Sequence, residues 1–332
     1  MTDARYDVTG IGNAIVDVIG QCDDAFLANI GALKGAMRLV GADDIDRIYA
    51  TMGPAVEISG GSAANTIAGI ASFGGKAGFI GKVADDEFGR IFSHDIQSLG
   101  VAFKSEPVTG DLPTSRSLIL VTPDGERTMN TFLGISTNLD NAAIDADLIR
   151  DSAILYLEGY LFDRDGAKTA FRDAVKIARD AGRDVALTLS DGFCVDRHRE
   201  EFKSLIKSGI SILFANESEI TSLYETASFD DAAAKARADA KLAVLTRSAK
   251  GSVIYSGAQS VVTPADAVKQ VVDTTGAGDL YAAGFLFGYS RQLPLETCGK
   301  LASLAAGEVI SHIGARPLVS LAELARGRGL IS

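Results

Sequence analysis

The sequence has few of the residues that build disulfide, metal or nucleic-acid sites. Its 332 residues include three cysteines without a C-x-x-C pair, and three histidines that lie far apart along the chain. This pattern excludes a disulfide framework and a spaced set of metal-binding histidines, and it indicates a reducing compartment. The net charge of −11 argues against a nucleic-acid surface, because such a surface needs clustered lysine and arginine.

Long apolar runs are missing as well. No run approaches the roughly 18 apolar residues of a membrane-spanning helix. The first ten residues, MTDARYDVTG, contain two acids and lack the apolar core of a signal peptide. These absences favour a cytoplasmic protein without a membrane partner. Repeats, low-complexity tracts and proline-rich linkers are also absent, so we expect one large domain, with or without a small appendage.

Alternating strand and helix patterns run through most of the chain. Short apolar strands are predicted at 6–12, 153–159, 184–190, 211–215 and 242–247. Helical patterns are found at 62–74, where Ser62 is a plausible N-cap, and at 167–182. Buried strands separated by helices predict an α/β fold whose parallel sheet is covered on both faces.

Two segments break this alternation. Residues 104–133 contain two strand patterns around the turn Pro123–Glu126. Residues 13–41 also lack a regular succession of helix and strand. We expect these two segments to form a small, discontinuous β-sheet lid. The large α/β domain would then consist of residues 1–12, 42–103 and 134–332.

Two glycine-containing segments do not match common nucleotide-binding motifs. GIGNAIVD begins like a dinucleotide-binding fingerprint, but Ile15 stands at the third glycine position, which argues against a Rossmann site. GKAGFIGKV lacks the first glycine and the final serine or threonine of a Walker A loop. A nucleotide phosphate would therefore need another loop.

The segment VVDTTGAGDL, residues 271–280, places a carboxylate directly behind a glycine loop. A helix beginning at Gly276 would direct its free N–H groups at a ligand above the loop, with Asp279 in its first turn. The N–H groups of Gly276, Ala277 and Gly278 would form an anion hole beside a general base. That pairing suits phosphoryl transfer to an alcohol, although an aspartate at this position also stabilises a helix N-terminus.

An ordered set of motifs resembles those of the ribokinase-like (PfkB) carbohydrate kinases. The motifs are GNAIVD (12–17), GGSAANT (60–66), GKVADDEFG (81–89), NESE (216–219) and DTTGAGD (273–279). The resemblance covers nearly the whole chain. Within the family it is strongest to the adenosine kinases, through stretches such as FLANIGALKGAMRLV (26–40) and TLSDGF (188–193).

The resemblance implies a ribokinase-like three-layer α/β/α domain with a small β-sheet lid. It also implies that phosphate is transferred from ATP, with Mg²⁺, to the 5′-hydroxyl of adenosine. One alternative is a sugar kinase of the same fold that acts on ribose, fructose or a keto-deoxy sugar acid. A second alternative is a non-catalytic nucleoside-binding sensor. The sequence leaves open whether the protein is a monomer or a homodimer.

The resemblance also implies roles for individual residues on the substrate side. Asp279 would be the general base, and Asp17 would accept hydrogen bonds from the sugar hydroxyls. The other implied contacts are Asn13, Gly60, Gly61 and Asn65 around the sugar, and Leu39, Val40, Leu133 and Tyr160 around the adenine ring.

On the nucleotide side, the resemblance implies contacts from Asn216, Thr246, Gly251, Gly278 and Arg127, and a water-mediated Mg²⁺ contact from Glu219. Ser248 replaces the first glycine of the family's T-x-G-x-x-G loop. Asp273, the carbonyl of Thr275 and the backbone around Gly314 form a candidate K⁺ cage. The alternative is that Asp273 only hydrogen-bonds the loop.

Overall fold

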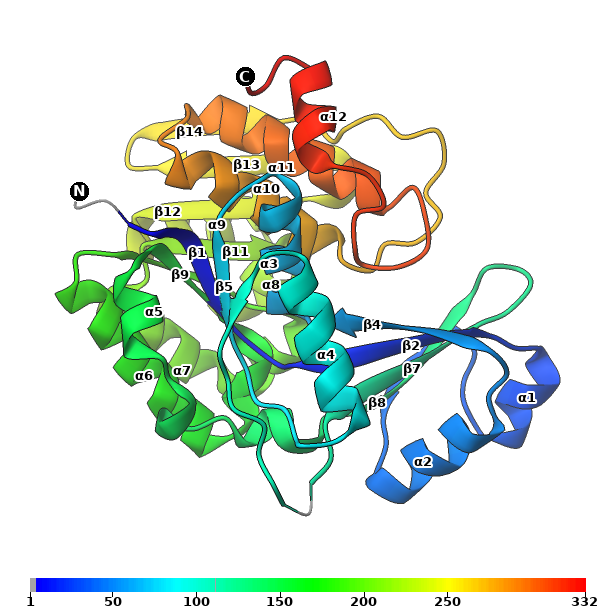
Figure 1. Cartoon of the computed structure of the whole chain (residues 1–332). Coiled ribbons are helices and arrows are strands. Elements are labelled where there is room, and N and C mark those ends of the chain that lie inside the picture. Colours follow the sequence, from blue (N-terminus) through cyan, green and yellow to red (C-terminus); the bar gives the residue numbers. More distant parts are fainter. Residues whose placement is uncertain (1–3, 111) are drawn as a thin grey trace.

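The computed structural model describes residues 4–110 and 112–332, which form a layered body with a projecting lid (Figure 1). Residues 1–3 and 111 fall within the predicted domain boundaries but lie outside the described residues. None of the helices in the described chain combines the length and apolar composition that a membrane crossing requires.

The large sheet contains nine strands within the described residues. In spatial order they are β14 (Gln259–Thr263), β13 (Ser252–Ser256), β12 (Leu242–Thr246), β11 (Ile212–Asn216), β10 (Asp184–Thr188), β9 (Ser152–Glu158), β1 (Tyr6–Ile11), β5 (Ala77–Ile80) and β6 (Ala102–Phe103). Neighbours pair in parallel from β12 to β6, which confirms the predicted parallel sheet. Only β13 and β14 run antiparallel to their neighbours, at one edge.

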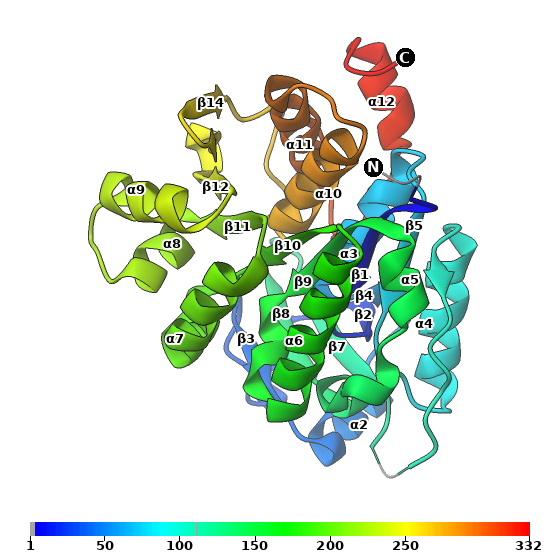
Figure 2. The ribbon, with the colours of Figure 1, turned by 90° about the vertical axis from the view of Figure 1, so that its left-hand side faces the viewer.

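Helices cover both faces of this sheet (Figures 1 and 2). One layer contains α3 (Ser62–Ser72), α4 (Glu87–Ser98), α10 (Ala277–Ser290), α11 (Leu295–Val309) and α12 (Leu321–Gly327). The opposite layer contains α5 (Ala146–Arg150), α6 (Asp165–Asp180), α7 (Gly192–Gly209), α8 (Glu217–Tyr224) and α9 (Phe229–Asp239). Short 3-10 turns lie at Gly134–Asn138, Asn141–Ala143, Gly159–Asp163 and Ser248–Lys250.

The strands are apolar on both sides because each side packs against a helical layer. In β9, Ile154 and Tyr156 belong to the core shared with α3 and α10. Leu155 and Leu157 belong to the core shared with α6 and α7. Alternating side chains of one strand thus fill two separate cores, which explains its continuous apolar run.

The lid is a second sheet of five strands among the described residues, and it projects from one side of the body (Figure 1). In spatial order they are β3 (Met37–Leu39), β8 (Arg127–Phe132), β7 (Ser115–Val121), β2 (Ile15–Gln21) and β4 (Ala55–Gly60). Helices α1 (Asp24–Asn29) and α2 (Ala42–Thr51) accompany it. The predicted hairpin around Pro123–Glu126 is confirmed as β7 and β8.

The first lid segment is longer than the predicted 13–41. Strand β4 pairs antiparallel with β2, and α2 contacts β7 and β8, so residues 42–60 belong to the lid rather than to the large domain. The sequence did not reveal this because the pairing joins β4 to a strand about 40 residues earlier, and no local pattern reports such a partner.

Glycines allow α10 to approach its neighbouring helix very closely. An added Cβ at Gly284 would lie 2.6 Å from the carbonyl carbon of Leu301 and 2.7 Å from the Cα of Ala302, both on α11. Real Cβ atoms do not approach backbone this closely, so a larger residue requires the two helices to move apart.

We therefore predict that Gly284→Ala destabilises the protein by about 1–3 kcal/mol through overpacking. Gly327→Ala is the matched control, because Gly327 is also helical but a Cβ there would meet no atom within 4 Å. Urea denaturation of both variants measures the difference. An unchanged unfolding free energy in Gly284→Ala would contradict the close packing of α10 on α11.

Candidate active site

The site forms where the N-terminus of α10 meets the N-terminus of α3, beneath the lid. Asp279 lies in the first turn of α10, as predicted. Its carboxylate accepts a 2.6 Å hydrogen bond from the Ser62 hydroxyl and a 2.9 Å bond from Asn65 Nδ2, both on α3. Burial raises the pKa of Asp279, and these two bonds oppose the rise. A carboxylate held in this way is both oriented and more basic than a solvated aspartate.

Ser62 does not cap α3, contrary to the sequence prediction. Gly61 occupies the N-cap position with a φ of 96°, and Ser62 is the first helical residue. A Cβ at Gly61 would overlap the carbonyl oxygen of Asn13. The hydroxyl of Ser62 is therefore free to bond Asp279.

Asp17 lies on β2 of the lid. Its pKa is raised to about 6, mainly by burial; the charges of Arg316 and Arg127 oppose the rise, and that of Asp279 adds to it. A Cβ at Gly60 would overlap the carboxylate of Asp17. Gly60 is thus needed to make room for Asp17.

Asn13 is buried and held by a residue that sequence reasoning missed. Its Nδ2 donates to Glu158 Oε1 at 2.6 Å, and the hydroxyl of Ser136 donates to its Oδ1 at 2.8 Å. Glu158, at the end of β9, also accepts a 2.8 Å bond from the N–H of Ala63. Burial raises the pKa of Glu158 to about 7. The only sign of Glu158 in the sequence was that it is the one acid at the end of the apolar strand LYLE.

A second missed residue is Arg316, in the segment after α11. Its guanidinium donates to the carbonyl of Ser59 at 2.6 and 3.0 Å and to the carbonyl of Ala64 at 2.9 Å. It therefore joins the end of β4 in the lid to the start of α3. The charges of Asp95, Asp17 and Asp279 raise its pKa, while burial lowers it to about 10, so it stays protonated at neutral pH.

Of the three N–H groups predicted to form the anion hole, two are free of backbone partners within the described residues and that of Ala277 is not; the role of the loop stays a prediction. Gly276 has a φ of 77° and caps α10, and a Cβ there would crowd Ala315. The N–H of Ala277 donates to the carbonyl of Thr274 at 3.2 Å. In the described backbone, the N–H groups of Gly276 and Gly278 have no such partner. Gly278 has open space where a Cβ would stand, so a ligand can approach it closely.

Asn216 and Glu219 form a capping box at the start of α8. Asn216 Nδ2 donates to Glu219 Oε1 at 2.6 Å, and the N–H of Glu219 donates to Asn216 Oδ1 at 2.8 Å. Burial raises the pKa of Glu219 to about 7, with Asp191 and Asp279 adding to the rise. The two side chains therefore cap α8, and a role toward nucleotide or metal stays a prediction.

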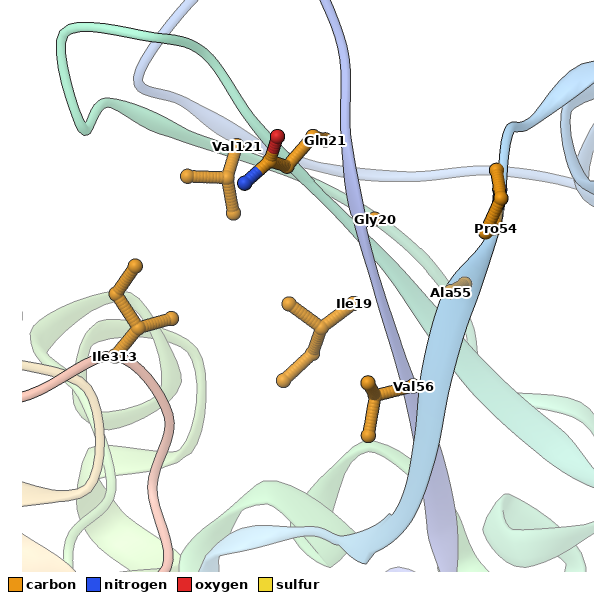
Figure 3. A pocket seen from close by; sticks show the side chains of 8 residues that line it. All are labelled: Ile19, Gly20, Gln21, Pro54, Ala55, Val56, Val121 and Ile313. Carbon is orange, nitrogen blue, oxygen red and sulfur yellow. The ribbon is translucent and has the colours of Figure 1, made fainter.

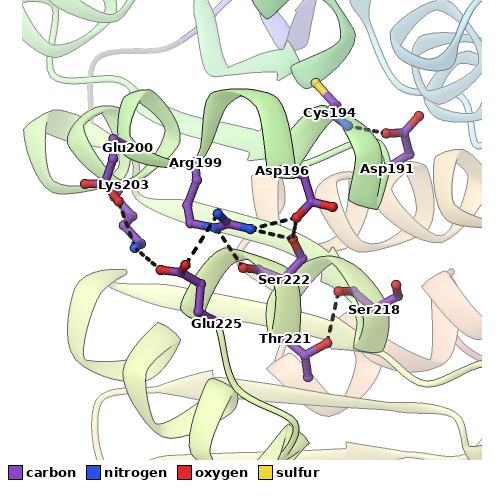
Figure 4. Close-up of polar contacts among 10 residues, drawn as sticks. All are labelled: Asp191, Cys194, Asp196, Arg199, Glu200, Lys203, Ser218, Thr221, Ser222 and Glu225. Carbon is purple, nitrogen blue, oxygen red and sulfur yellow. Dashed lines mark hydrogen bonds and ion pairs between the residues drawn. The ribbon is translucent and has the colours of Figure 1, made fainter.

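Side chains of α7 contact α8, the helix that begins at this capping box (Figure 4). Arg199 of α7 donates to the carbonyl of Ser222 at 3.0 Å and pairs with Asp196 and Glu225. Lys203 also pairs with Glu225. Each exposed pair contributes little by itself, but together they fix the orientation of α8.

The loop after β12 keeps the shape that glycine would give it. Ser248, which replaces a family glycine, has a φ of 51°, a left-handed conformation that costs a non-glycine residue about 1–2 kcal/mol. Gly251 has a φ of 80°, and a Cβ there would overlap the carbonyl oxygen of Thr263. Thr246 ends β12 beside Asn216, with which it pairs in the sheet. Thr246 and Asn216 thus lie side by side at the C-terminal ends of two neighbouring strands.

Arg127 reaches from the lid to the glycine loop. Its guanidinium forms an ion pair with Asp273 and a 3.1 Å hydrogen bond with the hydroxyl of Thr275. Its Nε and second terminal nitrogen are buried and have no partner among the described residues. Two donors therefore remain for an anionic ligand between lid and loop.

The predicted nucleobase contacts come from both the lid and the large domain. Leu39 is 60% exposed at the end of β3, and Tyr160 is 39% exposed and donates to the carbonyl of Ser190. Val40 and Leu133 flank β3 and β8. None of the four lines the apolar cavity between the lid and the segment after α11, so their role stays a prediction.

An apolar cavity of about 380 Å³ lies between the lid and the segment after α11 (Figure 3). Ile19, Val56 and Val121 of the lid face it from one side, and Ile313 faces it from the other. Ile19 lies two residues after Asp17 on β2, so both side chains point to the same face of the lid. The cavity is therefore a second feature of the face that carries Asp17.

These features match known proteins over almost the whole chain. The pattern of the pfkB family carbohydrate kinases matches residues 31–321. An adenosine kinase from Sinorhizobium meliloti is 55% identical, with a TM-score of 0.90 over 98% of this chain and 100% of that one. A probable sugar kinase from Rhizobium etli is 49% identical, with a TM-score of 0.91 over 99% and 100%. A probable fructokinase-5 from Arabidopsis thaliana is 32% identical over 70% of this chain and 74% of its own length.

The fold and the site define a phosphotransferase that acts on an alcohol group, and this is the class to which these relatives belong. The chain belongs to the pfkB carbohydrate kinase family, with the ribokinase-like fold. Kinases of this family bind a small-molecule substrate and ATP, and they generally use a divalent metal.

The position of Arg316 generates a prediction about pH. Its positive charge lowers the pKa of Asp17 and Asp279, so replacing it with a neutral residue raises both. A general base must be ionised to act, so the acidic limb of kcat/KM in Arg316→Gln should move to higher pH. Because Arg316→Lys keeps the positive charge, the acidic limb of its kcat/KM profile should stay near the original pH. If both variants lose activity equally at every pH, Arg316 acts only through its contacts.

Proposed function

We propose that this kinase transfers the γ-phosphate of ATP to the 5′-hydroxyl of adenosine, which forms AMP and ADP. The adenosine kinase from Sinorhizobium meliloti supports this, because it is 55% identical across nearly the entire chain. Such a reaction would serve purine salvage.

The apolar cavity under the lid is the observation that carries the proposal. A nucleoside adds a flat, weakly polar ring to its ribose, whereas a sugar acid adds charge. The cavity is lined by the side chains of Ile19, Val56, Val121 and Ile313, and no charged residue lines it. Such a surface favours burial of an adenine ring over burial of a carboxylate.

In the proposed reaction, each polar residue has one task. Asp17 accepts hydrogen bonds from the ribose diol, since a carboxylate can accept from two adjacent hydroxyls. Asn65, whose Oδ1 has no partner in the described chain, accepts from a sugar hydroxyl. Asp279 takes the proton from the 5′-hydroxyl as that oxygen attacks the γ-phosphorus. The N–H groups of Gly276 and Gly278 bind the charge on the transferred phosphoryl group.

The metal fits this site through water and phosphate rather than through a protein cage. No cluster of three histidine, cysteine or acidic ligands occurs among the described residues. Mg²⁺ commonly keeps several waters and binds substrate phosphates, so the single buried carboxylate of Glu219 suffices as an outer partner. When bound, Mg²⁺ neutralises charge on the phosphates. Glu219, with a pKa near 7, would become more fully ionised beside it.

A sugar kinase is the second candidate, because named relatives include a probable sugar kinase and a probable fructokinase. The polar part of the site suits any alcohol beside a vicinal diol. An ADP-release assay across adenosine, inosine, guanosine, ribose and fructose separates the candidates. Adenosine should give the highest kcat/KM. A higher value for fructose or ribose would overturn the proposal while leaving the phosphotransferase class intact.

Asp279→Asn tests the general base. The amide can still accept a hydrogen bond from Ser62 but cannot take a proton, so kcat should fall by about 10²–10⁴-fold. Adenosine binding, measured by calorimetry, should change little because Asp17 remains. Near-normal turnover in this variant would show that another group removes the proton.

Asp17→Ala tests the sugar contact. Losing a charged hydrogen-bond acceptor should weaken adenosine binding by about 1.5–3 kcal/mol. Binding of 2′,3′-dideoxyadenosine should change much less, because that ligand lacks the diol. Equal losses for the two ligands would place Asp17 away from the ribose.

A further inference from the structure

The carboxylate of Asp273 already has a full set of donors from its own chain. Its Oδ1 accepts from the N–H and the hydroxyl of Thr275 at 3.0 and 2.7 Å. Its Oδ2 accepts from the N–H of Gly314 at 2.9 Å and pairs with the guanidinium of Arg127. A carboxylate offers about four lone-pair sites, and these four donors fill them.

This arrangement does not fit the K⁺ cage predicted from the sequence. A cation needs a free oxygen lone pair, yet the carboxylate of Asp273 already accepts hydrogens from Thr275 and Gly314. Its negative charge is balanced by Arg127, which pairs with a carboxylate that is only 5% exposed. A K⁺ ion bound to Asp273 would have to displace the guanidinium or one of these hydrogen bonds. The structure therefore supports the alternative, in which Asp273 hydrogen-bonds the loop.

The ion pair joins β8 of the lid to the loop that precedes α10. Arg127 begins β8 of the lid, where it pairs with Val121. Asp273 lies three residues before Gly276, and Gly314 precedes Ala315, the residue that packs on Gly276. Asp273 thus holds both sides of the glycine loop, and Arg127 of the lid balances its charge.

We propose that Arg127 is the built-in cation of the anion hole, so that seating of the lid, rather than a bound monovalent ion, fixes the loop for phosphoryl transfer. This rests on the anion-hole role proposed above. Arg127 acts here as a positioning residue through Asp273. The two remaining donors of its guanidinium stay available to the nucleotide.

The first test replaces K⁺ with tetramethylammonium at constant ionic strength. Because Arg127 supplies the cation, the wild-type enzyme should not need K⁺. Its kcat should change by less than about twofold, and its thermal midpoint by less than about one degree. A large fall in turnover that K⁺ restores would overturn the proposal, as would a specific rise in thermal midpoint with K⁺.

The second test is a double-mutant cycle of Arg127→Ala and Asp273→Asn on the nucleotide-free enzyme. If the two residues act as one ion pair, Asp273→Asn should lower the thermal midpoint much less in the Arg127→Ala variant than in the wild-type enzyme. If the two substitutions lower the thermal midpoint additively, the proposal is overturned, because Arg127 then does not act through Asp273. This readout needs no turnover, so it stands even if the Asp279→Asn result removes the anion-hole assignment.

The same cycle in kcat separates positioning from loss of stability. Arg127→Ala should lower kcat by about 10²-fold, because the loop is no longer held in place. Arg127→Lys, which keeps a positive charge, should recover part of that loss. Arg116→Ala is the matched control, since Arg116 is a buried lid arginine that pairs with Asp46 and stacks on Phe88. If Arg116→Ala lowers kcat equally, lid stability explains the effect and the proposal fails.

Discussion

The close contact between α3 and α10 determines the geometry of the site. Gly69 of α3 has no side chain, and a Cβ there would lie only 2.6 Å from the Cβ of Ala283 on α10. The hydroxyl of Thr66 adds a 3.1 Å bond to the carbonyl of Asp279. Because the helices pack this tightly, side chains from the start of α3 reach the carboxylate in the first turn of α10. The orientation of the Asp279 carboxylate is therefore a consequence of core packing.

Buried charge is the second constraint on this site. Asp17, Glu158 and Glu219 all have pKa values raised mainly by burial, because removal from water disfavours their negatively charged forms. Two arginines oppose this negative charge from different directions. Arg316 joins the floor of the site to the lid through backbone carbonyls, and Arg127 approaches from the lid. The position of the lid and the charge balance of the site are thus coupled.

The lid and the floor contribute different parts of the function. In the proposed reaction, the large domain supplies Asp279 and the glycine loop for phosphoryl transfer, a chemistry that does not depend on what the alcohol is attached to. The lid would supply Asp17 together with the apolar side chains around the cavity, and these would select the acceptor. Such a division is consistent with relatives of similar structure that carry names of both adenosine and sugar kinases.

The sequence by itself determined the succession of buried strands and helices, the lid hairpin and the glycine loop followed by Asp279, because each is a local pattern of burial or backbone conformation. Tertiary structure decided the rest. Strand β4 entered the lid through a pairing that no nearby residue reports. Glu158 and Arg316 became site residues only when Asn13 and Ser59, 145 and 257 positions away, were brought against them. The sequence allowed Asp273 to be a cation ligand, but in the folded chain N–H groups and Arg127 point at its carboxylate. The sequence could not show this, because backbone conformation and not residue type sets the direction of an N–H group.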